Sequence, residues 1–346
     1  TYDHINSTLR QDLAVSFYRM LEFFMENYIL TSSGNSYVSS HNIRNCVMTM
    51  RAAIALHGAD GLSSSQKTQV NSWFTTLLDK WESGILPAFA HFRDDDGAWN
   101  WGAAYGMFGF PPQYQLFDDM KYGTDRDYYQ SQAWIKESIN QYWYFYRPDN
   151  YCIHLGDAIV KLDQANRVMY RHAAEYDDAR SKYLVQVYNQ SQYLRNSNLV
   201  FAKLLYKDFT RSTVPHPQPP LNYWADKTGL SVSRTSWNED ATMLWFYNAP
   251  AKRTDHEHRD NNTFTIIKDK PLIVDAGFYD SYATSHYNNY YTRTIAHNSI
   301  CVYDGTESYR NLGRSVSNDG GQIESDRLEN LDDVFSNEHR RGKWIR

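Results

Sequence analysis

The chain has 346 residues, enough for two domains of ordinary size with a buried core in each. Its net charge of −5 excludes a globally basic protein that binds nucleic acid, while a local basic cleft stays open. No apolar run is long enough to cross a bilayer, so we expect no membrane partner. Aromatic residues make up 16% of the chain, and their flat faces suit sugar stacking as well as core packing, which weakly favours a carbohydrate-handling protein.

The first part of the chain carries helical periodicity. Between residues 11 and 30, Leu13, Phe17 and Leu21 recur at spacings of three and four. Gly-, Pro-, Asp- and Asn-rich loops separate the helical segments, which indicates antiparallel helix hairpins, in either a toroid or a bundle. Helices are predicted over Gln11–Leu30, Ser40–His57, Ser64–Glu82, Tyr128–Tyr146, Ala179–Gln190 and Ser197–Lys207.

The chain changes character at the proline-rich segment 214–220, which predicts a stiff, non-helical linker. After it apolar and polar residues alternate, as they do in half-buried strands. We expect a helical domain over 1–213 and an antiparallel β-sandwich over 221–346. Because so few strands would leave a sheet edge uncovered, we expect the natural chain to continue or this to be a fragment. Strands are predicted at 230–234, 243–247, Thr263–Ile267, Leu272–Val274 and Ser299–Tyr303.

The strongest chemical signal is a set of histidines and one aspartate in the second part. In a strand, His256 and His258 would share one face, because side chains repeat every two residues. Asp275 follows an apolar run that reads as a buried strand, and His297 lies further on. Imidazoles with one carboxylate suit Zn²⁺, whereas a histidine pair alone is a weak signal. The pattern predicts a candidate metal site.

The same residues carry a resemblance to a known family. The chain resembles heparinase II/III-type polysaccharide lyases, the heparinase II branch most of all, and the resemblance spans most of the chain. The matching segments are His256-x-His258-x-Asp260, Phe264, Pro271-Leu272-x-x-Asp275-x-Gly277, Tyr291-x-Arg293-Thr294-x-Ala296-His297-Asn298-Ser299, Arg234-x-x-Trp237, Asp240-Ala241-Thr242 and residues 96–105.

This resemblance implies an N-terminal α/α toroid, incomplete in this chain, followed by antiparallel β-sheets, with the active cleft between them. It implies that Tyr105 and His256 are the two proton-transfer groups. His258, Asp275 and His297 would then hold a zinc ion, which we expect to be structural. His41 is the expected toroid group beside the substrate carboxylate, and Asn42 is the alternative.

Three further residues are candidates for substrate binding. Trp99 and Trp101 could stack on sugars, although packing inside the toroid explains them equally well. Arg171, in a basic cluster with Arg167 and Arg180, could bind sulfate or uronate groups. A solvated helix face with acidic partners such as Glu175, Asp177 and Asp178 is the favoured account of that cluster.

The resemblance implies cleavage of heparin or heparan sulfate by β-elimination at uronic acids. Alginate, chondroitin or another uronan is an alternative substrate, and a non-catalytic binding protein for acidic glycans is an alternative function. We expect a glycosaminoglycan partner, no nucleic acid, and a homodimer as a candidate assembly. A periplasmic or secreted location is expected, although the first residues show no secretory signal. Three buried thiols are expected at Cys46, Cys152 and Cys301, with one disulfide as an alternative.

Overall fold

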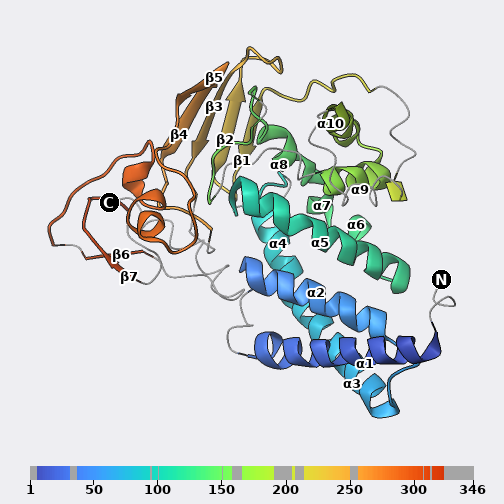
Figure 1. Ribbon diagram of the computed structural model, residues 1–346. Helices are drawn as coiled ribbons and strands as arrows, with labels where there is room; N and C mark the ends of the chain where they lie inside the picture. The colour runs from blue at the N-terminus through green and yellow to red at the C-terminus, as the bar shows by residue number, and fades with distance from the viewer. Residues whose placement is uncertain are drawn as a thin grey trace. The chain divides into compact units, whose positions relative to one another are not determined.

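The computed structural model describes residues 6–31, 37–93, 96–99, 101–149, 151–157, 166–190, 205–206, 214–249, 256–306, 308–311 and 314–322. The chain divides into two compact units (Figure 1). Unit 1 contains Thr1–Ala90, Pro112–Ser131 and Leu328–Arg346, and unit 2 contains His91–Pro111 and Gln132–Arg327. Unit 2 thus combines helices with the sheet, whereas the predicted boundary at 214–220 separates them; that boundary stays a prediction.

Unit 1 is built on three long helices, drawn in blue in Figure 1. They are α1 (Ser7–Phe24) with its π-helical end η2 (Met25–Ile29), α2 (Ser40–Leu56), and α3 (Ser64–Lys80) with η4 (Trp81–Ile85). Helix α2 packs against both α1 and α3, and their apolar faces bury Leu21, Val47 and Leu77. A capping box of Ser63 and Gln66 fixes the start of α3. These three helices confirm the sequence prediction.

The remaining helices are α4 (Leu86–Arg93), α5 (Gly102–Gly123), α6 (Tyr128–Ser131), α7 (Ala133–Glu137), α8 (Ile139–Tyr144), α9 (Asn166–Tyr176) and α10 (Ala179–Gln190). Helix α10 confirms the prediction, and the others depart from it. Helices α4, α5 and α9 were not predicted, and the single helix expected over Tyr128–Tyr146 is three short ones. The helix expected at Ser197–Lys207 lies outside the described residues except for 205–206, which are helical.

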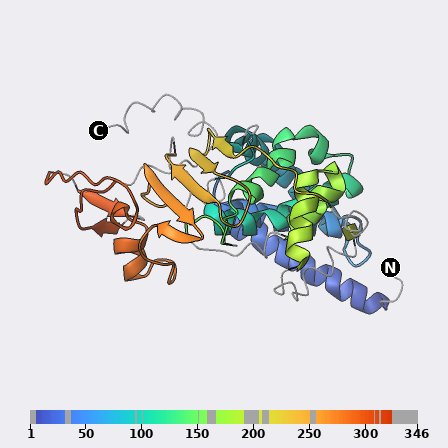
Figure 2. The same cartoon turned by 90° about the horizontal axis from the view of Figure 1, so that it is seen from above.

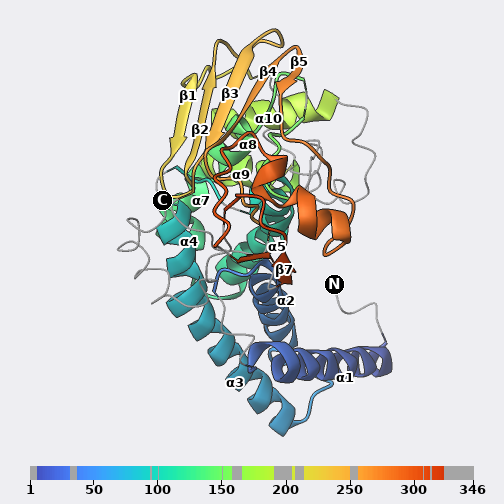
Figure 3. The same cartoon turned by 90° about the vertical axis from the view of Figure 1, so that its left-hand side faces the viewer.

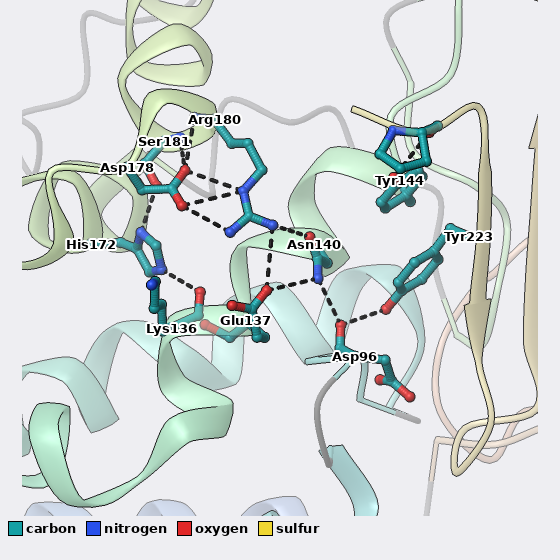
Figure 4. A network of polar contacts seen from close by, with 12 residues as sticks. Asp96, Lys136, Glu137, Asn140, Tyr144, His172, Asp178, Arg180, Ser181 and Tyr223 are labelled. Carbon is teal, nitrogen blue, oxygen red and sulfur yellow. Dashed lines mark hydrogen bonds and ion pairs between the residues drawn. The ribbon is translucent and has the colours of Figure 1, made fainter. Parts of the chain in front are cut away.

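A partly buried polar network joins α9 and α10 to α7 and α8 in unit 2 (Figure 4). The Arg180 guanidinium pairs with Asp178 at 2.8 Å and donates to Asn140 Oδ1 at 2.5 Å. Beside it, His172 Nε2 donates to the Lys136 carbonyl oxygen at 2.7 Å, and the Ser181 hydroxyl lies 2.5 Å from His172 Nδ1. Since burial lowers the pKa of His172 to about 4, the ring is neutral and Ser181 is the donor in that bond.

A five-stranded antiparallel sheet forms the other layer of unit 2, in the order β1 to β5 (Figure 3). Burial alternates along its central strands, so that one face packs inward. Val232, Trp245 and Thr265 form a row across that face. Helix α8 covers β1, where the Tyr144 and Tyr223 rings stack 4.2 Å apart. The strands are β1 (Asn222–Ala225), β2 (Leu230–Arg234), β3 (Thr242–Tyr247), β4 (Thr263–Lys268) and β5 (Lys270–Ile273).

The Arg234-x-x-Trp237 motif has a structural role at the end of β2. The Arg234 guanidinium lies 4.3 Å from the centre of the Trp237 ring and donates to the Tyr146 carbonyl oxygen at 2.8 Å. Burial lowers the pKa of Arg234 to about 10, which still leaves it charged at neutral pH. Through this hydrogen bond the motif connects β2 to the residues that follow α8.

The region after β5 contains short elements, coloured orange to red beside the β4–β5 end of the sheet (Figures 1 and 2). They are the π-helix η7 (Tyr287–Tyr291), the 3-10 helix η8 (Thr294–Ala296) and a hairpin of β6 (Tyr309–Asn311) and β7 (Arg314–Val316). The strand predicted at Ser299–Tyr303 is wrong, because these residues pair with no strand and Ile300 and Val302 are exposed. A toroid and a β-sandwich stay predictions.

The structure also bears on the expectations for the cysteines and for membrane-spanning segments. Cys46 and Cys152 are buried free thiols as expected, whereas Cys301 is exposed, so the prediction of three buried thiols is wrong for one of them. Among the helices that the structure describes, none is both long and apolar enough to cross a membrane.

Candidate functional site

Two glycines bring three distant segments of unit 2 into backbone contact. Gly102 starts α5 with a φ of +73°, and a Cβ there would lie 2.1 Å from the Leu155 carbonyl oxygen. Gly156 has a φ of +75°, and a Cβ there would lie 3.0 Å from the His256 carbonyl oxygen. Ala103 donates its backbone N–H to Leu155 at 2.9 Å. Glycine at both positions therefore lets the start of α5 meet the loop at 155–157 and the segment at 256–258.

Tyr105, one turn into α5, lies flat on His256. Their ring centroids are 3.6 Å apart and their planes differ by 9°. The Tyr105 hydroxyl also lies 3.5 Å from the hydroxyl of Tyr279. The structure therefore brings together the two residues to which the resemblance assigned proton transfer.

Asp157 is the centre of the polar contacts beneath this pair, and its side chain is fully buried. Its Oδ2 accepts from His256 Nδ1 at 2.7 Å. Its Oδ1 accepts from His258 Nε2 at 3.0 Å and from the Tyr287 hydroxyl at 2.7 Å. Burial alone would raise the pKa of this carboxyl, but the hydrogen bonds from the two histidines outweigh it and hold the pKa below its ordinary value. Asp157 is therefore a carboxylate at neutral pH.

His256 and His258 converge on Asp157 without lying in a strand. The sequence predicted that a strand would place them on one face, and this is wrong: the residues are in an irregular segment before β4. Both rings turn inward because one carboxylate accepts from both. The segment is buried throughout, from His256 to Asp260.

Three candidate metal ligands meet beside this carboxylate. One donor atom each from His258, Asp260 and His297 lie within 4.8 Å of one another. His258 Nδ1 and His297 Nε2 are buried and make no hydrogen bond to the described residues. Burial lowers the pKa of His258, so its ring is neutral and Nδ1 offers a lone pair. Two inward-facing imidazole nitrogens with a carboxylate are a donor set that fits Zn²⁺.

Asp275, predicted as a zinc ligand, lies behind His297. Its Oδ2 accepts from His297 Nδ1 at 2.9 Å, and its Oδ1 lies 3.3 Å from the hydroxyl of Thr263. This is the arrangement in which a carboxylate orients a metal-bound histidine. The strand before it, β5, is an exposed edge rather than a buried strand as predicted. Asp275 is itself buried.

A second contact between a histidine and a tyrosine lies beside these residues. His154 Nε2 lies 2.8 Å from the Tyr291 hydroxyl, on the π-helix that also carries Tyr287. Burial lowers the pKa of His154 to about 4, so that its ring is neutral. The π-helical turn thus presents Tyr287 to Asp157 and Tyr291 to His154, and such turns are frequent at functional sites.

The other predicted residues lie elsewhere. His41 and Asn42 are in the first turn of α2, in unit 1, and their role at a substrate carboxylate stays a prediction. Trp99 and Trp101 are 0% and 1% exposed and pack edge to face, which favours packing over sugar stacking. Arg171 is buried and pairs with Glu175 at 2.8 Å. Its acidic partner was expected, but its helix face is not solvated; a role in substrate binding stays a prediction.

Sequence reasoning missed Asp157, Tyr279 and Tyr287 as members of the site. Asp157 follows Gly156, and such a pair reads as an ordinary turn. Tyr279 and Tyr287 are two of 28 tyrosines. The only available signal was the density of aromatic residues between Phe278 and Tyr291, which strand and helix patterns do not explain.

Helices joined to an antiparallel sheet, with a buried carboxylate, stacked tyrosine and histidine and converging metal ligands, define an α-plus-β protein with a candidate acid–base site. Residues 217–341 match the family described as "Heparinase II/III-like, C-terminal". Residues 217–341 are thus similar to the C-terminal part of heparinase II/III-type proteins. Among curated proteins, none matches the sequence.

Solved structures share the fold at low sequence identity. The crystal structure titled as heparinase III is 14% identical over 86% of this chain and 43% of its own, with a TM-score of 0.59. A heparinase III gene product is 18% identical over 86% of this chain and 42% of its own, with a TM-score of 0.51. This chain therefore spans less than half the length of either structure. The expected closeness to the heparinase II branch stays a prediction.

Proposed function

We propose that this chain carries the acid–base site of a polysaccharide lyase that cleaves heparin or heparan sulfate at uronic acids by β-elimination. One observation carries the proposal: the Tyr105 ring is stacked on His256, 3.6 Å away, at the Asp157 carboxylate. The match of residues 217–341 to the heparinase II/III family model and the fold shared with a protein titled as heparinase III support the choice of substrate.

The reaction requires two proton transfers, one from C5 of the uronate and one to the oxygen that leaves C4. A base removes the proton at C5 of the uronate, and that electron pair forms the C4–C5 double bond. The C4–O bond breaks, and the leaving oxygen takes a proton from an acid. We assign these two transfers to Tyr105 and His256, whose side chains are both able to exchange protons and whose rings are stacked. Heparan sulfate contains two uronates that are epimers at C5, and two different proton-transfer groups suit such a pair.

The C5 proton becomes acidic only when the neighbouring carboxylate is neutralised, because the transition state adds negative charge beside it. A protonated His41 or the Asn42 amide is the proposed donor. Either group would act by stabilising the enolate-like transition state. Removing this donor should lower turnover far more than it lowers binding.

For a metal ion, His258 and His297 offer the inward-facing nitrogens, with a carboxylate from Asp260 or Asp275. A zinc ion bound there would supply a fixed positive charge and cross-link the segment at 256–260 to the loop at 297. We propose a structural role for it. Periplasmic or secreted location and a homodimer also stay predictions.

The test is to incubate the protein separately with heparan sulfate, heparin, chondroitin sulfate and alginate. The ultraviolet absorbance of the unsaturated uronate product reports elimination. A rise with heparan sulfate or heparin supports the proposal, whereas a rise with chondroitin sulfate or alginate only would change the substrate. Binding to these polymers without any rise would favour a non-catalytic glycan-binding protein instead.

A further inference from the structure

Asp157 is hydrogen-bonded to both His256 and His258, and these contacts determine which nitrogen of each histidine carries a hydrogen. An ionised carboxylate has no proton to donate, so every contact at Asp157 is a bond in which the carboxylate accepts. His256 Nδ1 lies 2.7 Å from Oδ2, and His258 Nε2 lies 3.0 Å from Oδ1. Each of these nitrogens must therefore carry a hydrogen.

The consequence for a neutral ring is opposite at the two histidines. A neutral imidazole carries one N–H, so His256 is the Nδ1–H tautomer and its Nε2 is the proton acceptor. His258 is the Nε2–H tautomer and its Nδ1 is the acceptor. That Nδ1 is the buried atom that faces Asp260 and His297 and makes no hydrogen bond to the residues described.

We propose that Asp157 is the positioning residue that prepares both parts of the site: it makes Nε2 of His256 the basic nitrogen, and it leaves Nδ1 of His258 to bind a cation. The half of this inference that concerns catalysis rests on the proposed function, whereas the half that concerns tautomers and metal does not. Loss of the Asp157 side chain would then affect both the proposed proton-transfer residue His256 and the candidate metal ligand His258.

The two carboxylate oxygens of Asp157 accept different numbers of hydrogen bonds, and this difference provides a test. Among the residues that the structure describes, Oδ1 accepts from His258 and from the Tyr287 hydroxyl, whereas Oδ2 accepts from His256. In Asp157→Asn the amide oxygen is expected at the Oδ1 position, since that orientation keeps two bonds. The amide NH₂ then faces His256 Nδ1, which can only accept from it. His256 is thereby forced into the Nε2–H tautomer.

The experiment uses the full chain with ¹⁵N-labelled histidine, freed of metal by chelation and then titrated with ZnCl₂. Two-bond ¹⁵N–¹H correlation spectra assign the tautomer of each ring, with His256→Gln and His258→Gln variants identifying the signals. In the wild type we expect an Nδ1–H His256 and an Nε2–H His258, and Zn²⁺ should shift the Nδ1 signal of His258. In Asp157→Asn we expect His256 to switch to Nε2–H while Zn²⁺ binding at His258 persists.

A matched control is Asp178→Asn, which alters a partly buried carboxylate of unit 2, in the network of Arg180 and Ser181 (Figure 4). It should lower stability without changing either tautomer. Tautomers of His256 and His258 that are the same in Asp157→Asn as in the wild type would overturn the inference.

Kinetics separate this inference from the proposed function. If the wild type eliminates a uronan, Asp157→Asn should lower kcat by about 10²–10⁴-fold with little change in KM, because a general base is lost while binding is kept. Full activity of Asp157→Asn would refute the positioning role. Absence of activity in the wild type would refute the lyase proposal and leave the tautomer result standing.

Discussion

The Tyr105 phenol ring lies parallel to the His256 imidazole, with ring centroids 3.6 Å apart and planes 9° apart. This contact joins α5 to the segment that precedes β4, two parts of unit 2 that are distant in sequence. It predicts how each residue responds to substitution.

Tyr105→Phe keeps the stacked ring and removes only the hydroxyl. We expect kcat on heparan sulfate to fall by about 10²–10⁴-fold, because a general acid or base is lost, while polymer affinity changes little. Product absorbance and direct binding measure the two quantities. Tyr122→Phe is the matched control, because Tyr122 is exposed on α5. Unchanged turnover in Tyr105→Phe would exclude this hydroxyl from the chemistry.

Gly102→Ala tests the backbone contact that sets the start of α5. An alanine at position 102 would have to adopt a φ of +73°, and its Cβ would lie 2.1 Å from the Leu155 carbonyl oxygen. Gly58→Ala is the control, since Gly58 has a φ of +68° but no atom within 4 Å of its Cβ position. Both variants should lose about 1–2 kcal/mol from the left-handed backbone. Only Gly102→Ala should lose more stability than this and also lose activity, as measured by urea unfolding and product formation.

Metal content discriminates between Asp260 and Asp275 as the carboxylate ligand. The geometry puts Asp260 in the group with His258 and His297, and Asp275 behind His297. Asp260→Asn should therefore abolish stoichiometric zinc. Asp275→Asn should weaken zinc affinity by about 10–100-fold without abolishing it. Elemental analysis after dialysis against a zinc buffer measures both. The reverse order of effects would restore the ligand set expected from the sequence.

Removing the metal should lower thermal stability, because an ion bound only by the folded state adds its binding free energy to folding. Chelation should therefore reduce Tm in the wild type. It should leave Tm nearly unchanged in His258→Gln, whose site has already lost a ligand. Equal shifts in the two proteins would show that the chelator acts elsewhere.

His172 predicts an acid sensitivity that is independent of the site. Burial lowers the pKa of its ring to about 4 from an ordinary value of 6.5, so below pH 6.5 the unfolded chain binds a proton that the folded chain does not. Its contribution is complete above pH 6.5 and is lost as the pH falls towards 4, by on the order of 3 kcal/mol. His172→Gln should flatten the dependence of the unfolding free energy on pH between 7 and 4. A slope equal to that of the wild type would contradict this account.

The sequence predicted the elements whose pattern is local and regular. The helices α1, α2 and α3 followed from apolar spacing, and the strands β2, β3 and β4 from alternation. Helix α5 did not, because its sequence contains Gly106, Gly109 and the pair Pro111-Pro112, which read as breakers. Tertiary context sustains a helix there that propensity disfavours.

The site shows the same division between local and non-local information. His256, His258 and His297 were predicted as part of a candidate metal site from the sequence pattern. The resemblance added Tyr105 and reassigned His256 to proton transfer. Asp157 has no motif of its own and is recognisable only because two histidines and Tyr287 converge on it from segments that follow much later. Because the partners of Asp157 are distant in sequence, no periodic pattern in the residues next to it indicates its role.

The sequence separation between Asp157 and His256, 99 residues, means that neither part of the chain holds the chemistry alone. Any cut between them separates the Asp157 carboxylate from the three hydrogen-bond donors that the described residues supply to it, since His258 and Tyr287 also follow His256. Each fragment would pay a desolvation cost for a group that lacks its counterpart. Two such fragments, expressed separately and mixed, would report their own reassembly by regaining the Tyr105–His256 stack. The chain is in this respect a natural starting point for a split protein.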